Sequence, residues 1–90
     1  MKFRITRHAG SAAPPDALDQ LSQLLRPSGD VVSFSNAGQE ITATWRESGS
    51  SRTEEELTAI GRLEVLDVVL ATCERAPELR ADWFAVSAVP

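Results

Sequence analysis

Residues 53–76, TEEELTAIGRLEVLDVVLATCERA, decide the fold that we expect for this chain, because they predict one long helix. Thr53 and Glu56 have the spacing of a capping box: the threonine hydroxyl accepts the Glu56 amide hydrogen, and the Glu56 carboxylate reaches back to the Thr53 amide. The three consecutive glutamates that follow Thr53 place negative charge at the positive end of the helix dipole. Pro77 prevents the helix from continuing much further.

This stretch carries more apolar surface than one buried helix face needs. At about 100° per residue, one broad apolar face is predicted, formed by Ala59, Leu63, Leu66, Val69, Leu70 and Cys73. The opposite, solvated face is formed by Glu64, Asp67, Ala71, Glu74 and Arg75. Leu57, Ile60 and Val68 do not fit this division, because they lie on or beside the charged side.

Three explanations account for the misplaced apolar residues. Gly61 can bend or break the helix, so that its first turns present another face to the same core; glycine inside a helix costs about 1 kcal/mol. Alternatively, Leu63–Leu70 is a buried strand, since a short apolar run does not distinguish the two structures. The third explanation is a second buried face, which packs against another subunit or a protein partner.

The composition indicates one globular domain, residues 1–90, with an ordinary apolar fraction of 42%. No apolar run approaches the ~20 residues that cross a bilayer, and MKFRITRHAGSAAPP has no apolar stretch typical of a secretory signal. The single cysteine, Cys73, has no partner for an internal disulfide, which favours a reducing, cytoplasmic location. Neither a membrane nor a cofactor is expected.

The net charge of −4 is concentrated in the second part of the chain, because residues 1–52 carry a net charge of +1 and residues 53–90 carry −5. An acidic chain without a Lys/Arg cluster lacks the electrostatic footprint of nucleic-acid binding. We therefore expect a protein partner, and a basic protein surface suits the charge better than DNA or RNA.

The rest of the chain predicts short strands and one further helix. Alternation of apolar and polar residues predicts strands over 2–8, 30–36, 41–46 and 82–89. The prolines Pro14 and Pro15 and the leucines that follow predict a helix that ends before Pro27. A turn at Ala37-Gly38 makes the second and third strands a hairpin, and residues 47–52 connect it to the long helix. The leucines Leu18, Leu21, Leu24 and Leu25 recur at the spacing of one helix face.

The order strand, helix, strand, strand, helix, strand predicts an α+β fold of the ferredoxin-like βαββαβ type. In that arrangement two helices cover one face of a four-stranded antiparallel sheet, and the first and third strands lie in the centre. The face without helices then carries the outward residues, namely Lys2, Arg4, Thr6, His8, Thr42, Thr44, Arg46, Trp83 and Ser87.

No catalytic or metal-binding motif stands out. His8 is the only histidine, and the expected sheet places no carboxylate beside it for general base catalysis. Cys73 lies on the apolar helix face, where a small core residue is expected. One histidine and one cysteine are too few for a tetrahedral N/S metal site. Residues 48–51, SGSS, precede a helix but lack the Gly-Lys-Ser/Thr ending of a phosphate loop.

The two tryptophans differ in the alternation of their strands. Trp45 shares the parity of Ile41 and Ala43, which predicts a core position. Trp83 has the parity opposite to Phe84, which places it on the open sheet face, where an exposed tryptophan is typical of a contact site. It could equally cover a sheet edge within its own chain.

Three classes of function follow. We expect first a small regulatory or interaction protein without catalysis, which binds a protein partner or a second copy of itself. The candidate interaction residues are Trp83, Arg4, Thr44, Arg46, Leu57, Ile60 and Val68. The alternatives are a dimeric module that binds a small molecule between subunits, and a small dimeric enzyme with His8 as base and Arg4 or Arg46 binding an anionic substrate.

Overall fold

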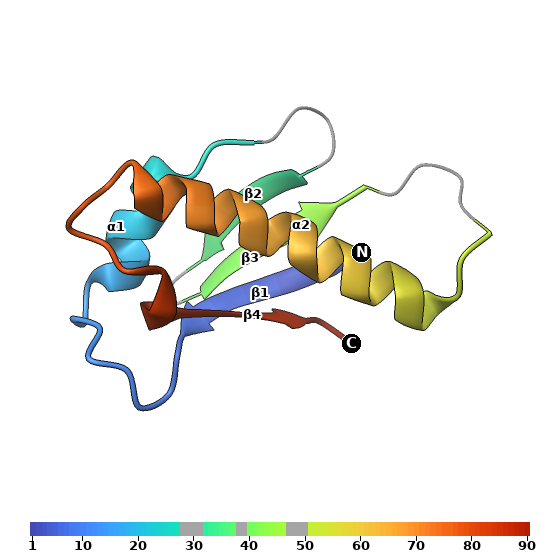
Figure 1. Cartoon of the computed structure of the whole chain (residues 1–90), viewed down its shortest axis with the longest axis horizontal. Coiled ribbons are helices and arrows are strands. Elements are labelled where there is room, and N and C mark those ends of the chain that lie inside the picture. Colours follow the sequence, from blue (N-terminus) through green and yellow to red (C-terminus); the bar gives the residue numbers. More distant parts are fainter. Residues whose placement is uncertain (28–31, 38–39, 47–50) are drawn as a thin grey trace.

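The chain forms one antiparallel sheet and two helices in the computed structural model, which describes residues 1–27, 32–37, 40–46 and 51–90 (Figure 1). The elements are, in order, β1 (Lys2–Arg7), α1 (Ala17–Leu24), β2 (Val32–Ala37), β3 (Glu40–Trp45), α2 (Glu54–Glu74), the 3-10 turn η1 (Ala81–Trp83) and β4 (Phe84–Ala88). The sheet order is β2-β3-β1-β4, and every pairing is antiparallel. The predicted α+β class, the βαββαβ order and the central position of β1 and β3 are confirmed.

One face of the sheet is apolar because its strands alternate as predicted. Phe3 on β1 lies opposite Ala43 on β3, and Ile5 lies opposite Ile41. All four side chains are buried, as is Trp45 at the end of β3, so the predicted core position of Trp45 is confirmed. The hairpin of β2 and β3 is present, while residues 38–39 and the connection over residues 47–50 lie outside the described residues, as does most of the segment compared with a phosphate loop.

Helix α1 begins later than the prolines suggest. The Pro14 carbonyl accepts the Ala17 amide at 3.1 Å, so Pro14 belongs to the turn that leads into the helix. Asp16 takes the N-cap position and accepts a hydrogen bond from the Gln20 side chain at 2.8 Å. The leucines at 18, 21 and 25 are buried as predicted, but Leu24 is 40% exposed, because it lies on the solvent side of the last turn.

Helix α2 is continuous from Glu54 to Glu74, so the alternative that Leu63–Leu70 forms a strand is wrong. Thr53 caps it, because its Oγ1 accepts the Glu56 amide at 3.2 Å. The threonine hydroxyl also donates to the Glu56 carboxylate at 3.1 Å. The carboxylate therefore pairs with the hydroxyl, and the expected bond to the Thr53 amide is replaced.

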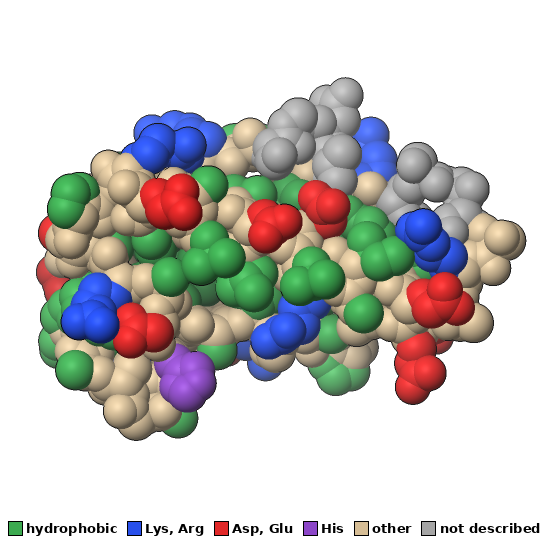
Figure 2. Space-filling model, in the orientation of Figure 1, with side chains coloured by type: hydrophobic (Ala, Val, Ile, Leu, Met, Phe, Trp, Pro, Cys, Tyr) green, Lys and Arg blue, Asp and Glu red, His purple; other side chains and the backbone are tan. Residues whose placement is uncertain are grey.

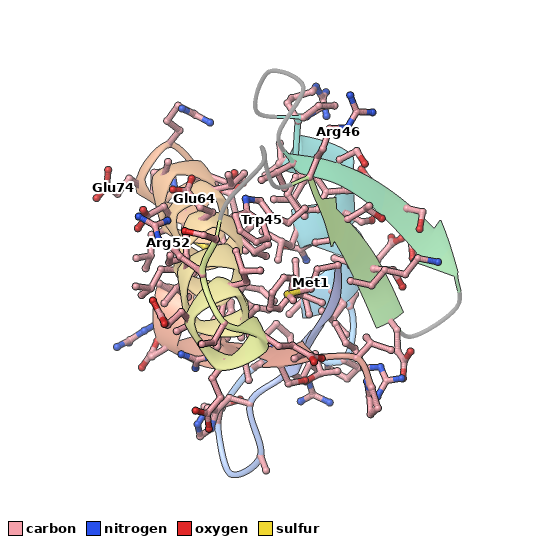
Figure 3. All side chains as sticks on the ribbon, turned by 90° about the vertical axis from the view of Figure 1, so that its right-hand side faces the viewer. Met1, Trp45, Arg46, Arg52, Glu64 and Glu74 are labelled. Carbon is pink, nitrogen blue, oxygen red and sulfur yellow. The ribbon has the colours of Figure 1, made fainter. Side chains whose placement is uncertain are left out.

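The face of α2 that packs on the sheet is narrow and made of small residues: Gly61, Val65, Val69, Thr72 and Cys73. A Cβ at Gly61 would lie 2.6 Å from Cε3 of Trp45 and 2.7 Å from Cζ of Phe3, so the glycine allows the helix to approach the sheet closely. Gly61 therefore marks close packing within an unbroken helix. Figure 3 shows Trp45 in the layer between α2 and the sheet.

Candidate interaction surface

A stripe of apolar side chains follows the solvent side of α2. We name as the α2 stripe the four residues Ala59, Leu63, Leu66 and Leu70. Their spacing of four, three and four residues places them within about 60° of one another around the helix. Leu63 is 55% exposed and Leu70 is 37% exposed, Ala59 is also exposed, and Leu66 is partly buried. Figure 2 shows hydrophobic side chains in a row along this side of α2.

Charged side chains border the α2 stripe unequally on its two sides. Helical geometry places Glu56, Asp67 and Glu74 along one side, and all three are exposed. Arg62 lies on the other side, toward β4, and Glu55 lies on that side in the first turn. Figure 2 shows the acidic side chains beside the hydrophobic row, and in Figure 3 Glu74 points away from the sheet. The helix as a whole carries six carboxylates and one arginine, so the surface around the stripe is strongly acidic.

Arg62 links α2 to the edge of the sheet. Its Nε donates a hydrogen bond to the Val86 carbonyl at 2.8 Å. Among the described residues, β4 pairs with β1 alone, so the Val86 carbonyl lies on an edge without a further strand. Exposed strand edges favour unwanted pairing with other strands. The Arg62 side chain opposes such pairing, because it occupies a backbone acceptor that would otherwise be available to another strand.

The α2 stripe consists of residues that the sequence places in the core, and this part of the prediction is wrong for Ala59, Leu63 and Leu70. Conversely, Leu57, Ile60 and Val68, which we expected on or beside the solvated side, are partly buried and pack against the core. The predicted buried face of α2 is therefore rotated about the helix axis relative to the face that the structure buries. Apolar residues surround α2 on nearly every side, and the small residues, not the leucines, mark the face that approaches the sheet.

The other predicted contact residues lie on the opposite side of the molecule, on the face of the sheet without helices. Arg4 forms an ion pair with Glu40 at 3.1 Å, and both side chains are nearly half exposed. Thr44 is exposed and lies opposite Lys2 and Ser33 on the neighbouring strands. Arg46 is exposed just beyond β3. This face is polar, with small hydroxyl side chains, and provides little surface for a hydrophobic contact.

Trp83 packs against the core of its own chain, so the alternative that places it on the open sheet face is wrong. It closes η1, where its amide donates to the Arg80 carbonyl at 3.1 Å, and β4 begins only at Phe84. The side chain is partly buried and packs against the core. Strand alternation places a residue correctly only within the strand, and Trp83 precedes it.

The residues considered for catalysis do not form a common site. Nδ1 of His8 lies 2.8 Å from the Ala9 carbonyl oxygen, and no hydrogen bond or ion pair joins His8 to Arg4 or Arg46 within the described ranges. Cys73 is buried, and this burial raises the pKa of its thiol above the ordinary value of 9.0. A thiol with a raised pKa is a poor nucleophile at neutral pH. In the part of the chain that the structure describes, no three His, Cys, Asp or Glu side chains are grouped to hold a metal ion.

Comparison of the chain with protein-family models, with curated proteins and with solved structures gives no significant match. Within the described ranges, neither helix combines the length and the apolar character that a bilayer span requires.

Proposed function

We propose that this protein is a small cytoplasmic interaction protein without catalytic activity, which binds another protein through the α2 stripe. The observation that carries this proposal is the exposure of Leu63, at 55%, on a well-formed helix. Burying a leucine side chain contributes about 1.5–3 kcal/mol relative to leaving it exposed. A partner that covers Leu63 and its neighbours therefore gains free energy that the isolated chain does not use. The single cysteine, Cys73, supports the proposed location in the reducing cytoplasm.

The charges around the α2 stripe favour a partner helix with basic flanks. A stripe with a 4-3-4 spacing packs well against a second amphipathic helix, since both then present interlocking side chains along the contact. Lysines or arginines beside the apolar residues of that helix would face Glu56, Asp67 and Glu74. Complementary charge accelerates association and disfavours acidic competitors. The proposed partner is thus a basic amphipathic helix of another protein.

A second copy of this chain suits the α2 stripe less well, because either orientation of two α2 helices brings like charges together. In an antiparallel pair centred on the stripe, Asp67 lies near Asp67 of the second copy, and Glu56 lies near Glu74. In a parallel pair, the two N-terminal glutamate triplets gather at one end. Each repulsion between exposed charges is small. Because the helix carries a net negative charge, these repulsions all oppose self-association.

The size of the α2 stripe predicts weak binding. Stable complexes bury about 800 Å² on each partner, and four side chains, of which one is partly buried, provide only a fraction of that area. Binding through the stripe alone should therefore be transient, with a dissociation constant in the micromolar range. A dissociation constant of 1 μM corresponds to a binding free energy of roughly −8 kcal/mol.

The test uses the protein alone and designed helical peptides. Light scattering on a sizing column, over a wide concentration range, should give the mass of a monomer. A peptide with leucines at the 4-3-4 spacing and lysines beside them should then bind saturably, and its affinity should fall as salt concentration rises. The double variant Leu63→Gln, Leu70→Gln should weaken binding about tenfold or more.

Matched controls distinguish binding at the α2 stripe from nonspecific hydrophobic binding. Leu24 on α1 is 40% exposed, so Leu24→Gln removes an equally exposed leucine and should leave peptide binding unchanged. The same peptide with glutamate in place of lysine should not bind. A dimer that is lost in the Leu63→Gln, Leu70→Gln variant would assign the stripe to self-association. Equal binding of all peptides, or no binding by any of them, would overturn the proposal.

A further inference from the structure

A hollow of about 570 Å³ lies at the end of the molecule where β1 runs into the loop toward α1. One wall is the loop over residues 8–12, and the other is the segment over residues 80–84 around η1. Its volume falls in the range of small-molecule sites. It lies away from the α2 stripe, because no stripe residue lines it, and it belongs to a single chain.

The two walls are held together by backbone hydrogen bonds. The His8 amide donates to the Trp83 carbonyl at 2.6 Å, which joins the loop directly to η1. The Ser11 amide donates to the His8 carbonyl at 3.1 Å and closes a four-residue turn. Gly10 occupies the third position of this turn with a φ of 80°, as a type II turn requires. The walls are therefore preformed, which lowers the entropy lost on binding a ligand.

Arg80 supplies the positive charge of the hollow. Its Nε donates to the Asp82 carboxylate at 3.3 Å, and both side chains are about 70% exposed. This side-on contact leaves the two terminal amino groups of the guanidinium available, and they match the two oxygens of one carboxylate. Asp82 limits the negative charge that the hollow accepts, since a doubly charged phosphate would lie beside a second anion.

The remaining lining combines apolar surface with two further polar groups. Trp83 and Ala12 provide most of the apolar part, because Phe84, which also lines the hollow, is buried in the core. The hydroxyl oxygen of Ser11 is buried and has no hydrogen-bond partner among the described residues. An unpaired buried hydroxyl costs free energy, and Ser11 lines the hollow, so a ligand oxygen that accepts from this hydroxyl would remove that cost. The imidazole of His8 borders the same space, with Nδ1 near the Ala9 carbonyl.

We propose that this hollow binds a small monocarboxylate that carries an apolar or aromatic group. The carboxylate pairs end-on with the Arg80 guanidinium and accepts a hydrogen bond from Ser11, while the apolar group packs against Trp83. Neither the carboxylate nor the apolar group of the ligand suffices alone for binding, because Arg80 is largely exposed and a solvated ion pair contributes little. The ligand is recognised by the combination of one negative charge and an adjoining ring or branched chain.

The proposal is tested by following backbone amide shifts in NMR spectra during titration with phenylacetate. The amides of residues 8–12 and 80–84 should shift saturably, with a dissociation constant of about 1 mM or below. Acetate, which lacks the ring, and benzyl alcohol, which lacks the charge, should each bind at least tenfold more weakly. Phenyl phosphate should also bind more weakly, because its second charge meets Asp82.

Two variants assign the effect to the hollow. Arg80→Gln should weaken phenylacetate binding about tenfold or more, since the charge-assisted pair is lost. The matched variant Arg75→Gln removes an exposed arginine at the end of α2 and should bind normally. Shifts that do not saturate, equal affinity in Arg80→Gln, or tighter binding of phenyl phosphate would each overturn the proposal. The Leu63→Gln, Leu70→Gln variant should retain phenylacetate binding, so this result is independent of the proposed protein partner.

Discussion

Gly61 on α2 faces Trp45 on β3 at a distance that admits no side chain: a Cβ added to Gly61 would lie 2.6 Å from Cε3 of the indole. The same Cβ would lie 2.7 Å from Cζ of Phe3, which is completely buried. The closeness of helix and sheet therefore depends on a residue that helix propensity alone disfavours by about 1 kcal/mol.

The first prediction is that Gly61→Ala destabilises the fold. On an exposed helix this substitution would stabilise by about 1 kcal/mol, but here the added methyl overpacks the core, which costs about 1–3 kcal/mol. We expect a net loss of about 1 kcal/mol in the free energy of unfolding, measured by urea denaturation. Ala59→Gly, at an exposed position of the same helix, is the control and should lose about 1 kcal/mol from propensity alone. A gain in stability for Gly61→Ala would contradict the close approach.

The sheet was predictable from the sequence because each strand alternates with a period of two. Phe3 and Ile5 on β1, and Ile41 and Ala43 on β3, are apolar in that period, and all four are buried together. Two consecutive alternating runs across a short turn also predict the pairing of β2 with β3. These signals are local, and the tertiary structure agrees with them.

The orientation of α2 was not predictable in the same way. Leucines usually mark a buried face, yet here the buried residues are smaller and recur every four positions at Gly61, Val65, Val69 and Cys73. That series of small residues indicates close helix packing. In the sequence it is obscured by the more numerous apolar residues on the other sides of the helix. The start of β4 differs from the predicted strand over 82–89 for another reason: the chain makes the 3-10 turn η1 before extending, which the alternation of residues 83–86 does not reveal.

The second prediction tests the orientation of α2 by comparing two apolar truncations. Val65 is fully buried, so Val65→Ala should lower the free energy of unfolding by about 2 kcal/mol through lost burial and a residual cavity. Leu63→Ala removes a larger side chain, but one that is 55% exposed, and should change stability by about 0.5 kcal/mol or less. Chemical denaturation of both variants decides the matter. The reverse order of effects would mean that α2 packs through its leucines.

The third prediction concerns the contact between α2 and β4. Arg62→Gln shortens the side chain that donates to the Val86 carbonyl and should destabilise the protein by about 1 kcal/mol, as for a typical hydrogen bond. Amide hydrogen exchange should also become faster in β4 than in β3, because the loosened strand lies at the edge of the sheet. Arg75→Gln is the matched control for loss of a positive charge near α2. Equal effects of both variants would show that charge alone, and not the contact with Val86, is responsible.

The fourth prediction concerns Cys73, whose thiol has a pKa raised by burial above the ordinary value of 9.0. Near pH 9 the thiol of the unfolded chain loses its proton while that of the folded chain keeps it. The unfolded state then binds fewer protons, so the free energy of unfolding must fall as pH rises from about 9 toward the folded pKa. Below about pH 8 both states hold the proton, and the thiol contributes no pH dependence.

Cys73→Ala isolates this effect from the other groups that titrate at alkaline pH. Urea denaturation in the presence of a reductant, from pH 7 to 10.5, should show that the native chain loses stability more steeply above pH 9 than Cys73→Ala does. The alanine variant is expected to be less stable at pH 7, because it leaves a small cavity, so the two curves should converge as pH rises. Parallel curves would mean that the thiol ionises equally easily in the folded and unfolded chains, which would place Cys73 at the surface of α2 and contradict its position against the core.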